Sequence, residues 1–204
     1  MLAAPSVHHL SLSGTLSGRS HRYEKKLSEL AGLYADAAAF DRVLTAGDAV
    51  VYAVEDYRPS AARGDLCFGV TCMQPGRIGD EFYMTRGHIH AVANRPETYR
   101  GEAGRGVMLM ESPEGETVTL EVTPGATIYV PPFWIHRSVN TGDEPLVMSF
   151  VYPADSGQDY GIIARSNGMR VRIVADGEGW QAVPNPGWRA RTPEDIAAIH
   201  ATEA

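Results

Sequence analysis

The stretch that decides the fold and chemistry of this chain is Thr85-Arg86-Gly87-His88-Ile89-His90, followed by Glu97-Thr98-Tyr99. On an extended strand, side chains two positions apart face the same side, so His88 and His90 converge on one point. Glu97 and Tyr99 are also two apart, on what is expected to be the next strand, and a short turn at residues 94–96 can bring them to the histidines.

A third imidazole is available much later in the chain, in Trp134-Ile135-His136. Three imidazoles and one carboxylate suit Fe, Mn, Ni, Co or Zn, and suit Ca or Mg poorly because those ions prefer oxygen ligands. Four protein ligands on an octahedral metal leave two positions open for a substrate with adjacent oxygens. The alternative, on spacing alone, is a set of surface histidines or hydrogen-bonded core histidines.

Short apolar or β-branched runs surround this stretch and predict an all-β protein. They are VVYAVE, DLCFGVTCM, EFYMT, GVMLM, TVTLEV, ATIYV, LVMSFVY and RVRIV, beginning at Val50. Turn signals such as QPGRIGD, SPEGE and NTGDEP separate them, which is typical of a sandwich or barrel. No linker or repeat divides the chain, so we expect one domain over residues 1–204 with a core at about 48–185.

Helices are expected only at the two ends. Residues 23–44 show apolar positions at helical spacing, and Gly47–Asp48 would end that helix. Near the C-terminus, Thr192 is a helix-capping residue and Pro193 suits a first turn, which predicts a short C-terminal helix. Residues 1–20 lack periodicity, and we expect them to be loosely ordered.

Composition excludes several classes of function. The net charge is 18 − 25 = −7, which disfavours nucleic acid as a partner. No run approaches the roughly 18 apolar residues of a membrane span, so no membrane association is expected. The only cysteines, Cys67 and Cys72, fall on opposite faces of one strand and are interpreted as small core residues, which fits a reducing cytoplasm.

The two histidine segments resemble the paired motifs of the cupins. In the first, His88-x-His90 is followed by six residues, Glu97, six more, and Gly104. In the second, Gly125, Pro131, His136 and Asn140 fall in register, while Phe133 stands where a glycine is usual, so the turn before His136 is expected to differ. The resemblance implies a cupin fold, a double-stranded β-helix or jelly-roll barrel, with short N- and C-terminal helical extensions.

A finer resemblance is to the cupin-type glucose-6-phosphate isomerases. It rests on the long spacing from histidine to glutamate, on PPFWIHRSVNTGDEP, and on YPADSGQDYG, and it covers roughly residues 23–188. It implies a cytoplasmic, homodimeric, metal-dependent isomerase that interconverts glucose 6-phosphate and fructose 6-phosphate.

The same resemblance assigns roles to individual residues. The metal ligands are His88, His90, Glu97 and His136, and Fe²⁺ is the expected ion, with Mn²⁺, Ni²⁺, Co²⁺ or Zn²⁺ as alternatives. Glu97 and Tyr152 are the candidate catalytic residues, by a proton-transfer or a hydride route, and a purely structural ligand is the alternative for Glu97. The substrate-binding positions are Tyr52, Thr71, Thr85 and Gly87 for the phosphate and Tyr99, Tyr152 and Tyr160 for the sugar.

These substrate residues also have an ordinary interpretation, because Thr and Tyr are favoured in strands and buried phenols are common in cores. No arginine cluster appears in the sequence, so neutral donors are expected to bind most of the phosphate. Gln158 stands where the family carries a histidine. An amide cannot exchange a proton near neutral pH, so Gln158 is not expected to transfer a proton when the sugar ring opens.

Three other functions stay open at this point. One is an isomerase of a related sugar phosphate such as mannose 6-phosphate. The others are a non-catalytic, sugar-binding cupin and a dioxygenase.

Overall fold

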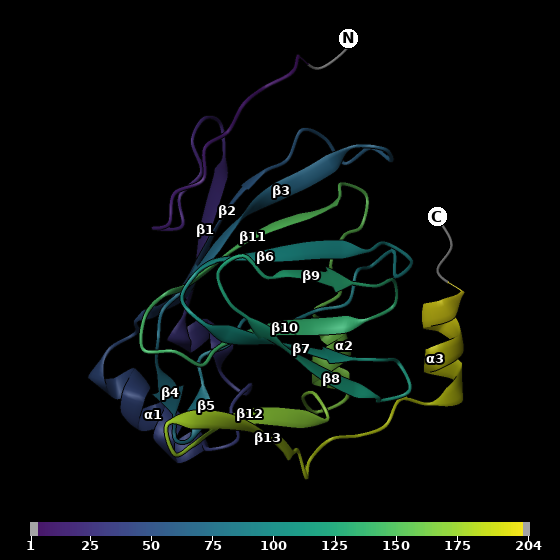
Figure 1. The fold of residues 1–204 in the computed structure, drawn as a ribbon. Coiled ribbons are helices and arrows are strands. Elements are labelled where there is room, and N and C mark those ends of the chain that lie inside the picture. The colour runs from purple at the N-terminus through teal and green to yellow at the C-terminus, as the bar shows by residue number, and fades with distance from the viewer. Residues whose placement is uncertain (1–3, 202–204) are drawn as a thin grey trace.

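The computed structural model describes residues 4–201 as antiparallel sheets that face one another, with short helices outside them (Figure 1). This architecture confirms the all-β cupin class expected from the sequence. Among the described residues, no helix is both long and apolar enough to cross a membrane.

The larger sheet has six strands in the order β1-β2-β3-β11-β6-β9, and every neighbouring pair is antiparallel. Its strands are β1 (His21–Lys26), β2 (Val50–Tyr57), β3 (Leu66–Met73), β11 (Leu146–Pro153), β6 (Glu97–Ala103) and β9 (Thr127–Val130). The late strand β11 inserts between β3 and β6, so segments that are distant in the sequence lie side by side.

Two smaller sheets complete the barrel. One has the order β10-β7-β8 and the other β13-β12-β5-β4. Their strands are β4 (Arg77–Ile78), β5 (Glu81–Phe82), β7 (Gly106–Glu111), β8 (Thr117–Val122), β10 (Ile135–Asn140), β12 (Val171–Asp176) and β13 (Gly179–Pro184). Strands β7 and β10 are buried along their whole length, so both of their faces are covered. One large apolar cluster fills the space between the sheets.

The N-terminal part of the chain departs from the expectation of a helix over residues 23–44. Residues 21–26 form β1, which pairs with β2, and Leu27–Leu30 form a single turn of 3-10 helix (η1). Only Ala37–Ala46 form an α-helix (α1), which ends at Gly47 as expected. The helical spacing of Leu27 and Leu30 extends over this one turn only. Both leucines lie in η1, and both side chains are fully buried.

The segment before β1 is more ordered than expected. Residues 1–3 lie outside the described part, but Leu10 and Leu16 form an isolated bridge, and the Leu16 N–H donates to Glu55 Oε2 over 2.8 Å. Leu16 is buried against the outer face of the larger sheet, so tertiary packing supplies the order that local periodicity does not predict.

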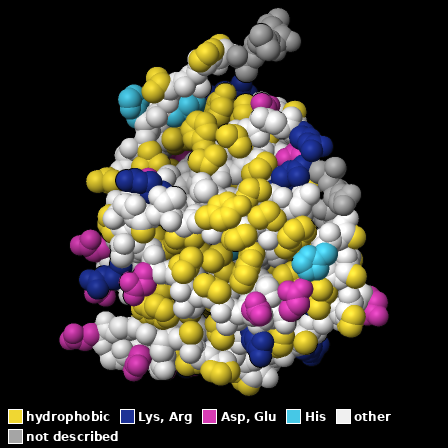
Figure 2. Space-filling model, turned by 45° about the vertical axis from the view of Figure 1, so that its right-hand side comes forward, with side chains coloured by type: hydrophobic (Ala, Val, Ile, Leu, Met, Phe, Trp, Pro, Cys, Tyr) yellow, Lys and Arg dark blue, Asp and Glu magenta, His cyan; other side chains and the backbone are white. Residues whose placement is uncertain are grey.

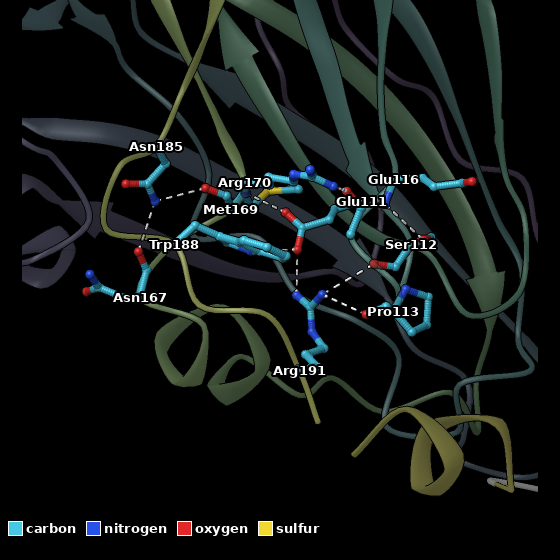
Figure 3. A network of polar contacts seen from close by, with 11 residues as sticks. Glu111, Ser112, Pro113, Glu116, Asn167, Met169, Arg170, Asn185, Trp188 and Arg191 are labelled. Atoms are coloured by element: carbon cyan, nitrogen blue, oxygen red, sulfur yellow. Dashed lines mark hydrogen bonds and ion pairs between the residues drawn. The ribbon is translucent and has the colours of Figure 1, made fainter. Parts of the chain in front are cut away.

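The C-terminal helix is confirmed as α3 (Pro193–His200), with the Asp195 N–H donating to Thr192 Oγ1. An additional short helix, α2 (Gly161–Arg165), follows β11. The segment leading to α3 is anchored by a buried polar network around Glu111 (Figure 3). Its carboxylate accepts from Trp188 Nε1 over 3.2 Å and from Arg191 Nη2 over 2.7 Å.

Candidate metal centre and substrate pocket

The two histidine segments meet through their backbones. His88 and His136 form an isolated antiparallel bridge, which places their side chains next to each other. Gly87 makes this approach possible, because it has a φ of 73° and a Cβ there would lie 3.0 Å from the His136 carbonyl oxygen. The glycine of the sequence motif is therefore required by backbone conformation and by packing.

The four predicted ligands converge on one buried point. The set His88, His90, Glu97 and His136 offers one ligand atom from each residue, and these atoms lie within 4.8 Å of one another. Glu97 Oε2 lies 3.1 Å from His136 Nε2 and 3.3 Å from His90 Nε2. All four residues are buried, with at most 8% of any of them exposed.

Backbone carbonyls orient two of the imidazoles toward that point. His90 Nδ1 donates to the Arg95 carbonyl over 2.8 Å, and His136 Nδ1 donates to the Trp134 carbonyl over 3.2 Å. A proton on Nδ1 leaves the lone pair on Nε2, and metal-binding histidines commonly donate their other ring N–H to a carbonyl in this way. None of the four inward-facing ligand atoms has a hydrogen-bond partner among the described residues. Buried polar atoms without partners are rare, so these residues fit a divalent metal ion.

The electrostatics of the cluster favour the same role. Burial, reinforced by the neighbouring His136, lowers the pKa of His88 well below its usual value, so its imidazole is neutral at neutral pH. Burial acts to raise the pKa of Glu97, but close contacts with His136 and His90 outweigh it and hold the carboxyl pKa well below its usual range. A neutral imidazole and an ionised carboxylate are the forms that bind a metal.

The turn before His136 contains the non-glycine residue Phe133 in a left-handed conformation, with a φ of 72°. The sequence predicts a turn altered from the glycine-containing form, yet Phe133 keeps the backbone region that glycine favours. The Phe133 N–H donates to the Ala93 carbonyl, and its ring lies 5.0 Å from the ring of His200 on α3. These contacts hold the turn in place.

A pocket opens beside the cluster and brings together nearly all the predicted site residues. Its lining contains ten of them: Tyr52, Thr71, Thr85, Gly87, His88, Glu97, Tyr99, His136, Tyr152 and Tyr160. The remaining one, His90, does not line this pocket. It lines a second cavity, next to α3. Gln158 also lines the pocket and accepts a hydrogen bond from the Tyr160 hydroxyl.

One end of the pocket is rich in hydroxyl groups and backbone donors. Thr85 Oγ1 accepts from the Ser138 N–H over 3.0 Å, which leaves the hydroxyl proton free to donate. The Tyr52 hydroxyl lies 3.5 Å from the backbone nitrogen of Arg86. Burial raises the pKa of Tyr52 to about 12, so the phenol stays a neutral donor.

Sequence reasoning missed five polar residues of the pocket lining: Tyr23, Asp56, Arg58, Arg86 and Ser138. Two of them are arginines, so the pocket lining carries positive charge. The sequence contains no cluster of arginines from which this charge could be predicted. Arg86 lies with its guanidinium 5.0 Å from the centre of the Tyr160 ring. The sequence did contain a signal for Asp56. Side chains alternate between the two faces of the strand beginning at Val50, so Asp56 shares a face with the predicted site residue Tyr52.

Comparisons with known proteins found a family and relatives that match most of the chain. Residues 24–189 match the family described as glucose-6-phosphate isomerase (GPI). A glucose-6-phosphate isomerase of Sinorhizobium medicae (strain WSM419) is 53% identical over 193 residues, which is 94% of this chain and 90% of the relative. That of Pyrococcus horikoshii is 40% identical over 177 residues, covering 87% of this chain and 93% of the relative.

Among solved structures, Bacillus subtilis oxalate decarboxylase aligns with 51% of this chain and 26% of its own, at 23% identity and a TM-score of 0.41. The family match and the two isomerase relatives each span most of the chain. The chain belongs to the glucose-6-phosphate isomerase family.

Proposed function

We propose that this protein interconverts glucose 6-phosphate and fructose 6-phosphate at the cluster of His88, His90, Glu97 and His136. The observation that carries the proposal is the set of four unpartnered ligand atoms beside a pocket lined with tyrosine and threonine hydroxyls. A divalent ion bound there supplies Lewis acidity toward the oxygens on C1 and C2 of the sugar. The chain's own residues bind, orient and exchange protons with the substrate.

Glu97 and Tyr152 are the proposed catalytic residues. Glu97 is ionised, and its carboxylate belongs to the proposed ligand set, which supports a role in holding a proton in transit between C1 and C2. Burial raises the pKa of Tyr152 above its usual value, which keeps its hydroxyl as a hydrogen-bond donor to the sugar. Tyr99 and Tyr160 are proposed to line the sugar chain.

The phosphate is proposed to bind at Tyr52, Thr71, Thr85 and Gly87. The support is their common place in the pocket wall and the chemistry of their donors, two hydroxyl-bearing threonines, a neutral phenol and a backbone N–H. A protein of net charge −7 needs local donors of this kind to hold a dianion.

We propose Fe²⁺ as the bound ion. A ligand set of imidazoles and one carboxylate supports it, and Mn²⁺, Ni²⁺, Co²⁺ and Zn²⁺ are the competitors. Metal-free protein reloaded under anaerobic conditions with each ion in turn, and assayed with glucose 6-phosphate, should give the highest kcat with Fe²⁺. A higher kcat with another of the five would replace this assignment.

The activity itself is tested with a panel of sugar phosphates. Chelation should abolish turnover of glucose 6-phosphate, and a divalent ion should restore it. Full turnover by rigorously metal-free protein contradicts the proposal, and preferential turnover of mannose 6-phosphate assigns a different substrate. Turnover in deuterium oxide separates the two routes, because transfer through Glu97 exchanges the moving hydrogen with solvent and a hydride shift retains it.

We further propose that the chain folds as one domain, forms a homodimer, and works in the cytoplasm. Figure 2 shows a face of the molecule on which hydrophobic side chains gather. Large hydrophobic residues are also exposed on four strands of the sheets, namely Leu66, Val118, Leu120, Tyr129 and Val151. Their burial against a second copy would favour a dimer. Light scattering coupled to gel filtration measures the mass, and a monomer would contradict the homodimer.

A further inference from the structure

The inner face of β2 carries a polar pair to which the proposed function gives no role. The pocket lining includes Tyr52, Val54 and Asp56, which alternate along β2, and Arg58 just beyond its end. Arg58 Nε and Nη2 donate to Asp56 Oδ2 over 3.0 and 2.6 Å. The guanidinium is therefore held along one edge, and the donors of Nη1 remain available.

The surroundings of the pair connect Arg58 with Tyr152 and Tyr160, which are proposed to line the sugar and lie in the same pocket wall. Burial raises the pKa of the Tyr152 and Tyr160 hydroxyls. The positive charge of Arg58 opposes this rise more than any other charge does, so it acts on both hydroxyls. Tyr23, from the neighbouring strand β1, lines the same wall. The Arg58 side chain is 48% exposed, whereas that of Asp56 is 1% exposed.

The charges of the pair decide what it can recognise. Asp56 carries a buried carboxylate whose second oxygen, Oδ1, has no hydrogen-bond partner among the described residues and lies 3.8 Å from the exposed His21 imidazole. The carboxylate compensates the charge of Arg58, so the pair attracts a dianion weakly. A directed donor without net charge suits the neutral hydroxyl groups of a sugar chain.

We propose that Arg58 binds a hydroxyl group of the sugar chain through its free guanidinium donors, and that Asp56 is the positioning residue that fixes Arg58. This role rests on the proposed function, since it takes the ligand of the pocket to be a sugar phosphate. It adds a specificity-determining contact to those proposed for the metal centre and the phosphate.

The first test measures binding to the metal-loaded protein by calorimetry, with sorbitol 6-phosphate and inorganic phosphate as probes. Arg58→Met removes the donors and should weaken sorbitol 6-phosphate binding by roughly tenfold to a hundredfold, while inorganic phosphate binds unchanged. Arg58→Lys should restore part of the affinity. Arg63→Met, which changes an exposed arginine outside the pocket lining, is the matched control.

Two outcomes overturn the proposal. Equal losses for both probes make Arg58 a phosphate ligand, and no loss for either removes it from the binding site. Because neither probe is turned over, these results do not depend on isomerase activity. If the wild-type protein binds both probes but does not isomerise glucose 6-phosphate, the proposed function fails and the contact stands.

The second test concerns Asp56. Asp56→Ala should raise KM for fructose 6-phosphate and leave kcat nearly unchanged, and adding it to Arg58→Met should have no further effect on KM. Additive losses contradict a positioning role. Metal content and near-ultraviolet circular dichroism report whether Asp56→Ala folds. If it does not fold, the binding measurements on Arg58→Met test the proposal.

Discussion

The backbones of His88 and His136 are hydrogen-bonded in both directions, with the N–H of each residue donating to the carbonyl of the other over 3.1 and 2.9 Å. This bridge fixes the separation of two predicted metal ligands that lie far apart in the sequence. Their rings are 4.4 Å apart between centroids, so the position of one imidazole constrains the other. The candidate metal centre is therefore preorganised by main-chain contacts.

Replacing one of these ligands should remove the metal without unfolding the protein. His136→Ala deletes an imidazole but keeps the backbone bridge, so we expect metal affinity to fall by roughly a hundredfold or more and activity to be lost. Metal content after dialysis and turnover of glucose 6-phosphate are the measurements. His9→Ala, at an exposed position, should change neither. Wild-type metal content in His136→Ala would exclude it as a ligand.

Alkaline pH should destabilise the protein through its buried tyrosines. Burial raises the pKa of Tyr52 to about 12 and shifts those of Tyr23, Tyr34 and Tyr152 further above the ordinary value of 10.0. Below that value these phenols are neutral in both states and the shift has no effect. Above it the unfolded chain ionises first, so the free energy of unfolding falls by about 1.4 kcal/mol per pH unit for each buried phenol.

Thermal unfolding followed from neutral pH to about pH 12 tests this expectation, with tyrosinate absorbance as a second signal. Tyr34→Phe should make the loss of stability with pH less steep. Tyr129→Phe, at an exposed position, is the matched control. A melting temperature that stays constant across this range would contradict the assignment.

Phe133 should respond to substitution in an unusual order. Both Phe133→Ala and Phe133→Gly lose the ring contact with His200, but only alanine keeps a Cβ at a φ of 72°. We expect the glycine variant to be more stable than the alanine variant by about 1 kcal/mol, the reverse of their usual order in regular structure. Urea denaturation of the two variants measures the difference. A more stable alanine variant would show that the turn relaxes.

The buried pair of Glu111 and Arg191 should be the most sensitive link of the C-terminal segment (Figure 3). Arg191→Met leaves the fully buried Glu111 carboxylate without its counter-charge, and we expect a loss of about 3–5 kcal/mol in the free energy of unfolding. Arg165→Met breaks an ion pair whose arginine is 62% exposed, and it should cost about 1 kcal/mol or less. Equal losses in the free energy of unfolding for Arg191→Met and Arg165→Met would show that burial of the ion pair does not determine its contribution. Replacing Glu111 and Arg191 together by Met should recover part of the loss.

Local rules predicted those parts of the fold in which one segment carries its own signal. The eight β-rich runs, the helix end at Gly47 and the capped helix after Thr192 all occur in the structure. The failure lies at residues 23–36, where helical spacing was present but β1 pairs with β2 and only one turn of 3-10 helix follows. Pairing with a distant strand is a tertiary effect, and it overrides the weak preferences of a short segment.

The candidate site was predictable where the chemistry is confined to a motif. The histidines and Glu97 could be recognised by spacing and residue type, and the structure brings them together. Arg58 and Tyr23 could not, because a single polar residue on a strand or just beyond its end has no distinguishing pattern. They become pocket residues only when β1 and β2 are placed beside the barrel interior.

The position of β11 has a consequence for how the chain is made. It pairs with β3 on one side and β6 on the other, although both are synthesised well before it. Until Leu146–Pro153 has left the ribosome, β3 and β6 each present an open edge with unpaired N–H and carbonyl groups, which invites pairing with other nascent chains. Fragments that end before Leu146 should therefore aggregate, and chaperones that hold extended segments should act on this chain at that stage of its synthesis.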